Sequence, residues 1–409
     1  MSQKTFPFEK AYRTLLAIIV FLIPSNLFFK FFVDSAYVHG LLIDYLLPKI
    51  YLSDIFLFAL FVVWFYEIWR KKLRIQLPIF LSALILIFFA RQFFTDKPLA
   101  SLWFFCKLLE FGAFGIFLAS HRELLKSKII LTAWGVMIGF QSFVGLFQFF
   151  FQRSVFPSYY FLGEPSFLHR IILAKGVFHG VIFVLPYGTT AHPNILAGTL
   201  VIATLILTKA YFQKNANFIG AALFAIIPIV VLYLTQCASA ALALIIGMFL
   251  LFFGQKILLR LSFHIFFPLY LAAFLAVPIL IHVLVGYFPQ NISIVRRDQL
   301  NQAAVQMILH QPLLGVGLNN FTAEVEKYNR SDEVVRFVQP AHHVGVLWFA
   351  DTGILGLCIV AFLALKKIQL RKYVTPLCIL FPILTLDHYL LTQQTGLLLT
   401  LFSLFFLGS

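Results

Sequence analysis

The sequence has few charged residues. Asp, Glu, Lys and Arg make up only 11% of its 409 residues, which is less than half of the roughly 25% that is usual in soluble globular proteins. This scarcity excludes a water-soluble domain. Acidic residues are especially rare, with 16 Asp and Glu against 31 Lys and Arg and a formal net charge of +15. In a membrane protein such an excess reports topology first, so we expect no nucleic-acid partner.

Cysteine and catalytic sequence signatures are also scarce. The four cysteines, Cys106, Cys237, Cys358 and Cys378, have no CxxC spacing and lie mostly in apolar segments, so they do not indicate a disulfide framework or a zinc site. No Gly-rich phosphate loop, HExxH motif or closely spaced pair of outer carboxylates is present. We therefore expect neither a metal ion nor another cofactor.

Apolar residues dominate the composition of the chain. They form 61% of the chain, with 51 Phe, and they fall in runs of about 15 to 24 residues, long enough to cross about 30 Å of hydrocarbon. The pattern predicts an all-α polytopic membrane protein with one integral domain, residues 1–409, and about twelve transmembrane helices. We expect these helices at residues 14–33, 50–69, 77–92, 99–119, 129–151, 193–209, 217–235, 238–255, 262–285, 344–364, 373–391 and 395–409.

The cations alternate between the connections of these segments. Eighteen of the 31 Lys and Arg precede the first segment or lie in the even-numbered connections, namely Lys4, Lys10, Arg13, Arg70, Lys71, Lys72, Arg74, Arg122, Lys126, Lys128, Lys209, Lys214, Lys256, Arg260, Lys366, Lys367, Arg371 and Lys372. The positive-inside rule places that side in the cytoplasm, so both termini are expected there.

Two long connections lie on the opposite, outer side. Outer loop 1 comprises residues 152–192 and outer loop 2 comprises residues 286–343. Long loops in compact proteins are usually functional or disordered, and these carry ordered-looking motifs such as FLGEPSF, PYGTTAHPN and RRDQLNQAAVQMIL. We therefore expect both loops to contain short helices and the site to lie on the outer side.

The motifs of the second half of the chain resemble those of a known family. HQPLLGVGLNNF, the preceding RRDQLNQAAVQMIL, the following HHVGVLWFADTGILGL, TAHPNILAG and DHYLLTQQTG are similar to those of the O-antigen ligase / O-antigen polymerase-like superfamily. The resemblance runs from about residue 150 to the end, and the topology agrees over the whole chain.

The resemblance implies an activity. It implies a GT-C-type membrane glycosyltransferase that moves a glycan from a polyprenyl diphosphate carrier, without metal and with inversion, on the outer face of the plasma (inner) membrane. The acceptor would be a lipid, another glycan or a protein, and membrane lipids would surround the chain. The motifs leave ligase and polymerase open as alternatives.

The resemblance and the side-chain chemistry indicate two catalytic candidates. Arg297 aligns with a family arginine, and arginine can hold the oxygens of a leaving diphosphate. His342 matches the family histidine that stands eleven residues before Gly353, and an imidazole with a pKa near 6.5 suits general-base chemistry. Transfer should then fall as the pH drops through roughly 6 to 7. His343, where the family usually has Asn, is expected to be structural.

Several polar residues are candidates for substrate binding. His192 and Asn194 flank Pro193 at a helix start, where free N–H groups favour an anion; an ordinary helix start remains equally open. The binding candidates as a whole are Arg296, His192, Asn194, Arg170, Arg336, Asp387, His388 and Gln393. Arg170 and Arg336 could replace family arginines that are absent here, at Leu185 and Ala238.

Other interpretations stay open. A transporter for lipid-linked glycans would place ionisable groups near the bilayer midplane, whereas here they collect in the outer third. A non-catalytic binder of polyprenyl glycans would explain the missing arginines. Lys107 and Glu110 lie three residues apart within one segment, so mutual neutralisation is the favoured interpretation. Glu164 is an acidic candidate that could equally be part of a turn.

Overall fold

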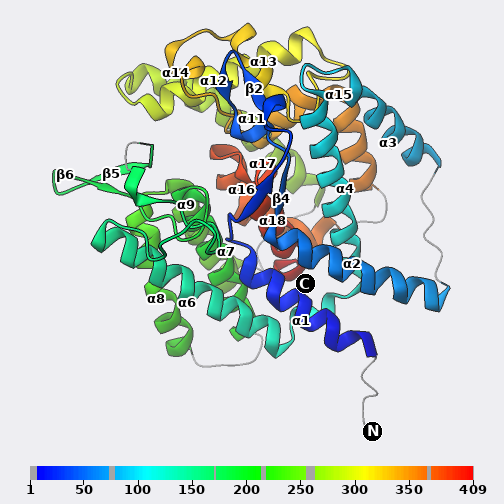
Figure 1. Ribbon diagram of the computed structural model, residues 1–409, viewed down its shortest axis with the longest axis vertical. Coiled ribbons are helices and arrows are strands. Elements are labelled where there is room, and N and C mark those ends of the chain that lie inside the picture. Colours follow the sequence, from blue (N-terminus) through cyan, green and yellow to red (C-terminus); the bar gives the residue numbers. More distant parts are fainter. Residues whose placement is uncertain are drawn as a thin grey trace.

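The computed structural model describes residues 7–72, 79–169, 172–212, 218–254, 263–365 and 370–408. Within these ranges the chain is mainly α-helical (Figure 1). The longer helices are α1 (Pro7–Leu22), α2 (Leu52–Lys71), α3 (Ile79–Arg91), α4 (Pro98–Ser120), α6 (Lys128–Phe151), α7 (Pro193–Phe212), α8 (Phe218–Thr235), α9 (Ala238–Phe249), α11 (Phe263–Tyr287), α12 (Ile292–His310), α15 (Val344–Leu365), α16 (Val374–Leu386) and α18 (Gln394–Leu407). The shorter ones are α5 (Arg122–Leu125), α13 (Phe321–Tyr328), α14 (Asp332–Val335) and α17 (Tyr389–Thr392).

Apolar composition explains which helices can lie in lipid. Six helices, α2, α4, α6, α7, α11 and α15, are long and apolar enough to cross a membrane, and five shorter apolar helices accompany them in the described ranges. An apolar helix overlaps each of the twelve predicted segments, but the number of spans is not confirmed. The prediction was wrong in detail for the first segment, because α1 ends at Leu22, just before Pro24, and strand β1 follows.

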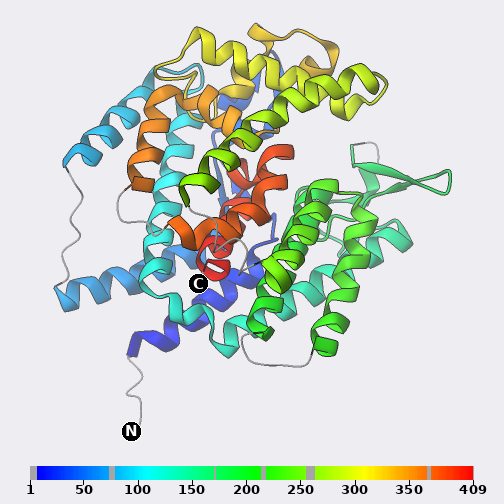
Figure 2. The same ribbon diagram turned by 180° about the vertical axis from the view of Figure 1, so that it is seen from behind.

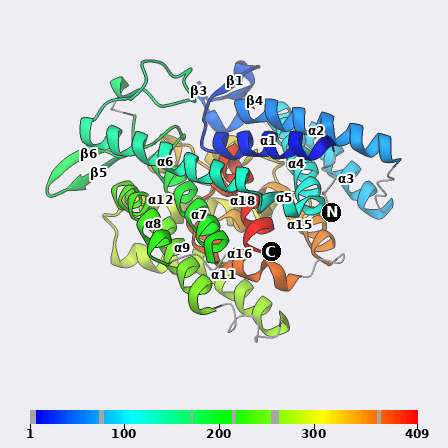
Figure 3. The same ribbon diagram turned by 90° about the horizontal axis from the view of Figure 1, so that it is seen from below.

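The helices differ in how deeply they are buried. In the most apolar part of α7, 83% of the residues are buried, compared with 6% in α11. α7 packs against α6, α8, α9 and α18, and α18 also packs against α4, α16 and α17. α18 lies near the centre in two perpendicular views (Figures 1 and 3), so α7 and α18 form part of the scaffold against which the polar segments are held.

Three short two-stranded antiparallel sheets modify the all-α prediction. β1 (Phe28–Lys30) pairs with β4 (Lys49–Tyr51), β2 (Tyr37–Val38) with β3 (Leu41–Leu42), and β5 (Lys175–Phe178) with β6 (Val181–Val184). The β5–β6 hairpin is the main regular structure of outer loop 1. Outer loop 2 instead contains the long helix α12 and the short helices α13 and α14.

Outer loop 2 lies at one end of the molecule. α12, α13 and α14 gather there with the β2–β3 hairpin, whereas α1 begins at the opposite end (Figure 1). Figure 2 shows α11 and α12, in yellow-green and yellow, at the same end from behind. This arrangement separates the outer-loop helices from the start of α1.

The GVGLNN turn anchors outer loop 2 to the helices. Gly317 has a φ of +110°, which favours glycine, and a Cβ there would collide with Thr95. The Asn320 Oδ1 accepts from the Lys97 N–H at 2.8 Å, and its Nδ2 donates to Ser101 Oγ at 2.5 Å. Asn320 is fully buried, so this part of the family motif has a structural role.

Candidate functional site

A group of polar residues from four separate segments meets beside α16. We call His192, Arg297, His342, Asp387 and His388 the His–Arg cluster. They come from the residue before α7, from α12, from the turn before α15 and from the break between α16 and α17. A ring contact and electrostatic proximity connect these five of the ten predicted site residues.

The end of α16 creates the break that holds Asp387 and His388. α16 ends at Leu386, Asp387 has an extended backbone, and the short α17 begins at Tyr389. The sequence analysis predicted one continuous helix over 373–391, which was wrong here. The break leaves the Leu386 carbonyl and the side chains of Asp387 and His388 available to neighbouring segments.

Arg297 joins α12 to this break. Its Nε donates to the carbonyl of Leu386 at 3.3 Å, and its Nη1 donates to Ser293 Oγ one turn earlier on α12. A guanidinium has five N–H donors, so these two bonds orient the group without using all of its donors. The remaining donors can serve an anion in the cluster.

His342 and His388 meet ring to ring. Their centroids are 5.1 Å apart with a near-perpendicular interplanar angle of 79°. His388 Nδ1 shares a 2.7 Å hydrogen bond with Thr392 Oγ1. The Nδ1 of His342 is buried and has no hydrogen-bond partner among the described residues. A buried polar atom without a partner calls for an explanation, and a bound ligand would supply one.

The charge environment of His342 is positive. Burial is the largest influence on the ring, followed by His388, Arg297, His192 and Arg296, and together they lower the pKa of His342 well below its usual 6.5. The imidazole is therefore neutral at pH 7, in the form that can accept a proton.

Asp387 is held by two hydrogen bonds. Asn194 Nδ2 donates to one carboxylate oxygen at 3.0 Å, and Ser239 Oγ donates to the other at 2.7 Å. These bonds link the starts of α7 and α9 to the end of α16. Asn194 is thus brought to the cluster as predicted, whereas Ser239 was missed because a lone serine at a helix start carries no distinctive sequence signal.

His192 and the close packing of α7 complete this side of the cluster. The exposed His192 accepts a 3.1 Å bond from the Asn194 N–H at its Nδ1. At Gly198, one turn further along α7, a Cβ would collide with the Tyr389 hydroxyl. Glycine in the TAHPNILAG motif therefore allows α7 to approach α17 closely.

Arg296 lies at the edge of the cluster. Its Nη2 forms a 2.6 Å ion pair with Glu333 of α14, and its guanidinium lies 4.5 Å from the centroid of the Phe337 ring. Its Nε is buried without a partner among the described residues. Arg296 therefore fixes α14 against α12 and also contributes positive charge near His342.

Two of the predicted binding residues, Arg336 and Gln393, are not part of the cluster. Arg336 pairs with Asp332 at 3.0 Å, and both side chains are more than two-thirds exposed, at 72% and 79%. Arg170 lies outside the described residues. Gln393 lines a separate small cavity next to the cluster. The missing family arginines are not replaced by Arg336, because it makes no described contact with the cluster.

Other sequence candidates have structural roles. The fully buried His343 donates from Nε2 to the Phe274 carbonyl at 2.9 Å and accepts from the Val346 N–H at 3.2 Å. Glu164 accepts bonds from the N–H groups of Val155 and Phe156, at 2.8 and 2.7 Å, and so stabilises a turn.

Lys107 is neutralised as predicted, with one addition. It forms an ion pair with Glu110 at 2.9 Å and a second one with Asp54 of α2. Asp54 could not be expected from sequence because it lies 53 residues away.

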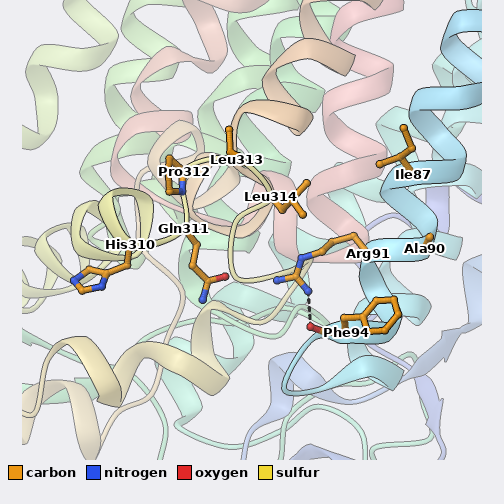
Figure 4. A pocket seen from close by; sticks show the side chains of 9 residues that line it. All are labelled: Ile87, Ala90, Arg91, Phe94, His310, Gln311, Pro312, Leu313 and Leu314. Atoms are coloured by element: carbon orange, nitrogen blue, oxygen red, sulfur yellow. Dashed lines mark hydrogen bonds between the residues drawn. The ribbon is translucent and has the colours of Figure 1, made fainter.

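A separate cavity lies away from the cluster. It has a volume of about 660 Å³ and lies between the end of α3 and the turn at residues 310–314 (Figure 4). Its walls are mainly apolar, and Arg91 donates to the carbonyls of Phe94 and Gly315 at 2.6 and 2.9 Å. Because this arginine is occupied by backbone carbonyls, the cavity offers less to an anion than the His–Arg cluster does.

The cluster has the chemistry of an anion site with a neutral base. Arg297 supplies fixed positive charge, Arg296 adds a cation that is paired with Glu333, and His342 supplies an unprotonated imidazole. In the part of the chain that the structure describes, no three His, Cys, Asp or Glu side chains are arranged to hold a metal ion.

A comparison with protein families agrees with the motifs. Residues 223–361, from α8 to α15, match the family model described as O-antigen ligase. The matched segment contains Arg296, Arg297 and His342, whereas His192, Asn194, Asp387 and His388 lie outside it. No curated protein matches the sequence. The match over residues 223–361 therefore relates the chain to the O-antigen ligase-like superfamily, as its motifs predict.

Proposed function

We propose that the protein is a glycosyltransferase that moves a glycan from a polyprenyl diphosphate carrier to an acceptor on the outer face of the plasma membrane. The meeting of Arg297, His342 and His388 in one cluster carries this proposal. It places fixed positive charge beside a neutral imidazole whose buried Nδ1 has no described partner. Relation to the O-antigen ligase-like superfamily supports the same activity.

The proposed reaction needs two kinds of stabilisation. An acceptor hydroxyl oxygen forms a bond to the anomeric carbon of the donor sugar, and the bond from that carbon to the diphosphate oxygen breaks on the opposite face, which inverts the configuration. Negative charge builds on the leaving diphosphate, where Arg297, with Arg296 nearby, stabilises it. The hydroxyl proton passes to His342.

In this proposal the remaining cluster residues position the reactants. Asp387 holds Asn194 and Ser239 and so fixes the starts of α7 and α9 around the anion. His192 and His388 add neutral rings at the edge of the site. No step is assigned to a metal ion, because the arginines neutralise the diphosphate.

A transfer assay tests the proposal. The purified chain in lipid nanodiscs is mixed with a radiolabelled polyprenyl diphosphate glycan and with extracted envelope acceptors. We expect the label to appear in a product that no longer carries diphosphate. A double variant with both Arg297→Ala and His342→Ala should form no such product. Intact donor after prolonged incubation with every acceptor class would contradict the proposal.

The same site suits a polysaccharide polymerase, the alternative within the superfamily. In that case the acceptor is a second lipid-linked glycan, and products of increasing length form in the absence of any other acceptor. A transporter would move the lipid-linked glycan across the membrane without breaking the bond to the diphosphate.

A further inference from the structure

A small polar cavity lies next to the His–Arg cluster. The β1–β4 region, α4, the GVGLNN turn and the junction of α17 and α18 form its walls. Tyr45 and His388 separate it from His342. The rings of Tyr45 and His388 are 5.3 Å apart and nearly perpendicular, and His388 in turn meets His342. A group bound in the cavity would therefore be separated from His342, the proposed base, only by the side chains of Tyr45 and His388.

The cavity is fixed by a network of buried charges. Lys107 pairs with Asp54 and Glu110, and Gln394 donates to Ser53 at 3.1 Å and to Asp54. These bonds join α2, α4 and α18 directly behind the cavity wall. A polar network with satisfied members is rigid, so the cavity is preformed.

Several groups on the wall keep free hydrogen-bonding capacity. Among the described residues, no partner bonds to the Tyr45 hydroxyl, to the carboxamide of Gln393 or to the Oδ1 of Asn319, although Asn319 Nδ2 donates to the Tyr45 carbonyl at 2.7 Å. The aromatic ring of Trp103 lies on the same wall. An apolar ring beside unused donors and acceptors matches a molecule that has both C–H faces and hydroxyl groups.

Charge argues against an anion as the ligand. The two cations at the cavity, Lys49 and Lys107, are already paired, Lys49 with Asp44 at 2.6 Å and Lys107 with two carboxylates. With no surplus positive charge, the cavity disfavours a phosphate and favours a neutral ligand. A lipid tail is disfavoured as well, because it would leave the polar groups of the wall without partners.

We infer that this cavity, lined by Tyr45, Trp103, Asn319 and Gln393, is a binding subsite for a neutral sugar ring of the glycan substrates. The role of this subsite rests on the proposed glycan transfer, in which a sugar of the substrate lies beside the reacting centre. The free volume of about 50 Å³ accommodates the hydroxyl edge of one ring, with the ring itself across the mouth against Trp103. The sugar comes either from the donor glycan or from the acceptor.

Direct binding tests the subsite independently of turnover. Saturation-transfer NMR on the purified full chain would use glucose and N-acetylglucosamine as probes, with no lipid-linked donor present. We expect transfer to at least one sugar and a loss of affinity of about fivefold in Gln393→Ala and in Tyr45→Phe, since each removes about one hydrogen bond of about 1 kcal/mol. Neither side chain has a described hydrogen bond, so both variants should fold.

Two matched variants separate this inference from the proposed function. Gln311→Ala removes a glutamine that lines the large apolar cavity instead (Figure 4) and should bind the sugars like the wild type. His342→Ala should also bind them, although it is expected to be inactive. Loss of transfer with normal sugar binding would therefore implicate the reacting centre alone. Absence of sugar binding, or equal binding by Gln393→Ala and the wild type, would overturn the subsite.

Steady-state kinetics distinguish the two sources of the sugar. If the acceptor occupies the subsite, Gln393→Ala raises the KM for the acceptor at saturating donor; if the donor glycan does, the variant raises the KM for the donor. Either result supports the subsite. An unchanged KM for both substrates would contradict it.

Discussion

In the proposed function, Arg297 can bind an anion only through the N–H groups that do not already bond to its neighbours. The bonds to Ser293 and to the Leu386 carbonyl use two of its five N–H groups. They also fix the direction of the guanidinium, which lowers the entropy cost of gripping a diphosphate. A lysine at this position would keep the charge but lose the planar fork.

We therefore expect Arg297→Ala to lower the rate of glycan transfer by about 10- to 100-fold, the equivalent of a charged hydrogen bond of about 1.5 to 3 kcal/mol. Arg297→Lys should retain an intermediate rate. Arg336→Ala is the matched control, because this cation is 72% exposed and pairs with Asp332, and its rate should stay near that of the wild type. Equal, full activity of both Arg297 variants would reduce Arg297 to an interfacial anchor.

The pH dependence of His342 differs from the expectation drawn from sequence. An ordinary histidine would lose the proton-accepting form as the pH drops through roughly 6 to 7. Burial and the neighbouring His388 and Arg297 lower the pKa of His342, so in the free protein the neutral form persists to lower pH. A bound diphosphate has the opposite effect, because its negative charge stabilises the imidazolium.

The two kinetic parameters should accordingly show different pH profiles. kcat/KM reports the free protein and should stay level through pH 6 to 7, with its acidic decline at lower pH. kcat reports the bound complex, and its decline should occur at higher pH than that of kcat/KM. Measuring kcat and kcat/KM from pH 4 to 8 tests this difference. If the two profiles coincide and are unchanged in His342→Ala, His342 has no part in the mechanism.

His342 and His343 are adjacent but should respond differently to substitution. We expect His342→Ala to lower the transfer rate by about two to four orders of magnitude if it is the general base, with little change in stability. His343→Ala removes the bonds to Phe274 and Val346, so it should lower the free energy of unfolding by about 1 to 3 kcal/mol. Thermal unfolding measures the loss of stability, and the transfer rate of the folded fraction measures the loss of catalysis. Equal losses of transfer rate per folded molecule in the two variants would contradict the different roles of His342 and His343.

At the scale of elements, apolar runs predict the helices well because a span must bury its backbone polar groups within itself. The ends are less predictable. α1 stops at Leu22, shortly before Pro24, although apolar residues resume at Leu27. α16 stops at Leu386 although the sequence shows no Pro or Gly there. The second break depends on Asn194 and Ser239, which satisfy Asp387 from distant parts of the chain.

The GVGLNN turn illustrates the same dependence on partners. Its glycines and asparagines belong to the HQPLLGVGLNNF motif, and Asn320 bonds to Lys97, Ser101 and Leu318. Asn320→Ala should therefore lower the free energy of unfolding by about 1 to 3 kcal/mol, because it leaves buried groups without partners. The half-buried Asn329→Ala is the matched control and should change less. Equal melting temperatures for Asn320→Ala and the wild type would contradict this.

At the scale of the whole molecule, the candidate residues were easier to predict from the sequence than the residues that surround them in the fold. The motifs predicted Arg297, His342, Asp387 and His388 from three separate segments, and the fold brings these segments together. Tyr45 and Ser239 could not be predicted, because nothing in the sequence indicates that the first outer connection or the start of α9 meets the end of α16.

The topology is the remaining prediction, and the arrangement of the ends supports a sharp test of it. α12 to α14 lie at the opposite end of the molecule from the start of α1 (Figure 1), and the clustered cations predict that the latter is cytoplasmic. Cysteines introduced at Asp332, whose side chain is 79% exposed, and at the exposed Glu123 should therefore face opposite sides. The unmodified chain with its four native cysteines provides the background. Asn320 is an unsuitable position in the same loop, because it is fully buried and a cysteine there would not react from either side.

An impermeant maleimide added to intact cells should label Asp332→Cys, whereas Glu123→Cys should react only after the membrane is disrupted. The physical reason is that the three cations at residues 122–128 and those in the other even-numbered connections resist translocation. In outer loop 2, by contrast, Arg296 and Arg336 are in ion pairs with Glu333 and Asp332. The reverse pattern would place the His–Arg cluster on the cytoplasmic side. A carrier-linked glycan on the outer leaflet could not then reach Arg297 or His342, and the proposed transfer would fail with the topology.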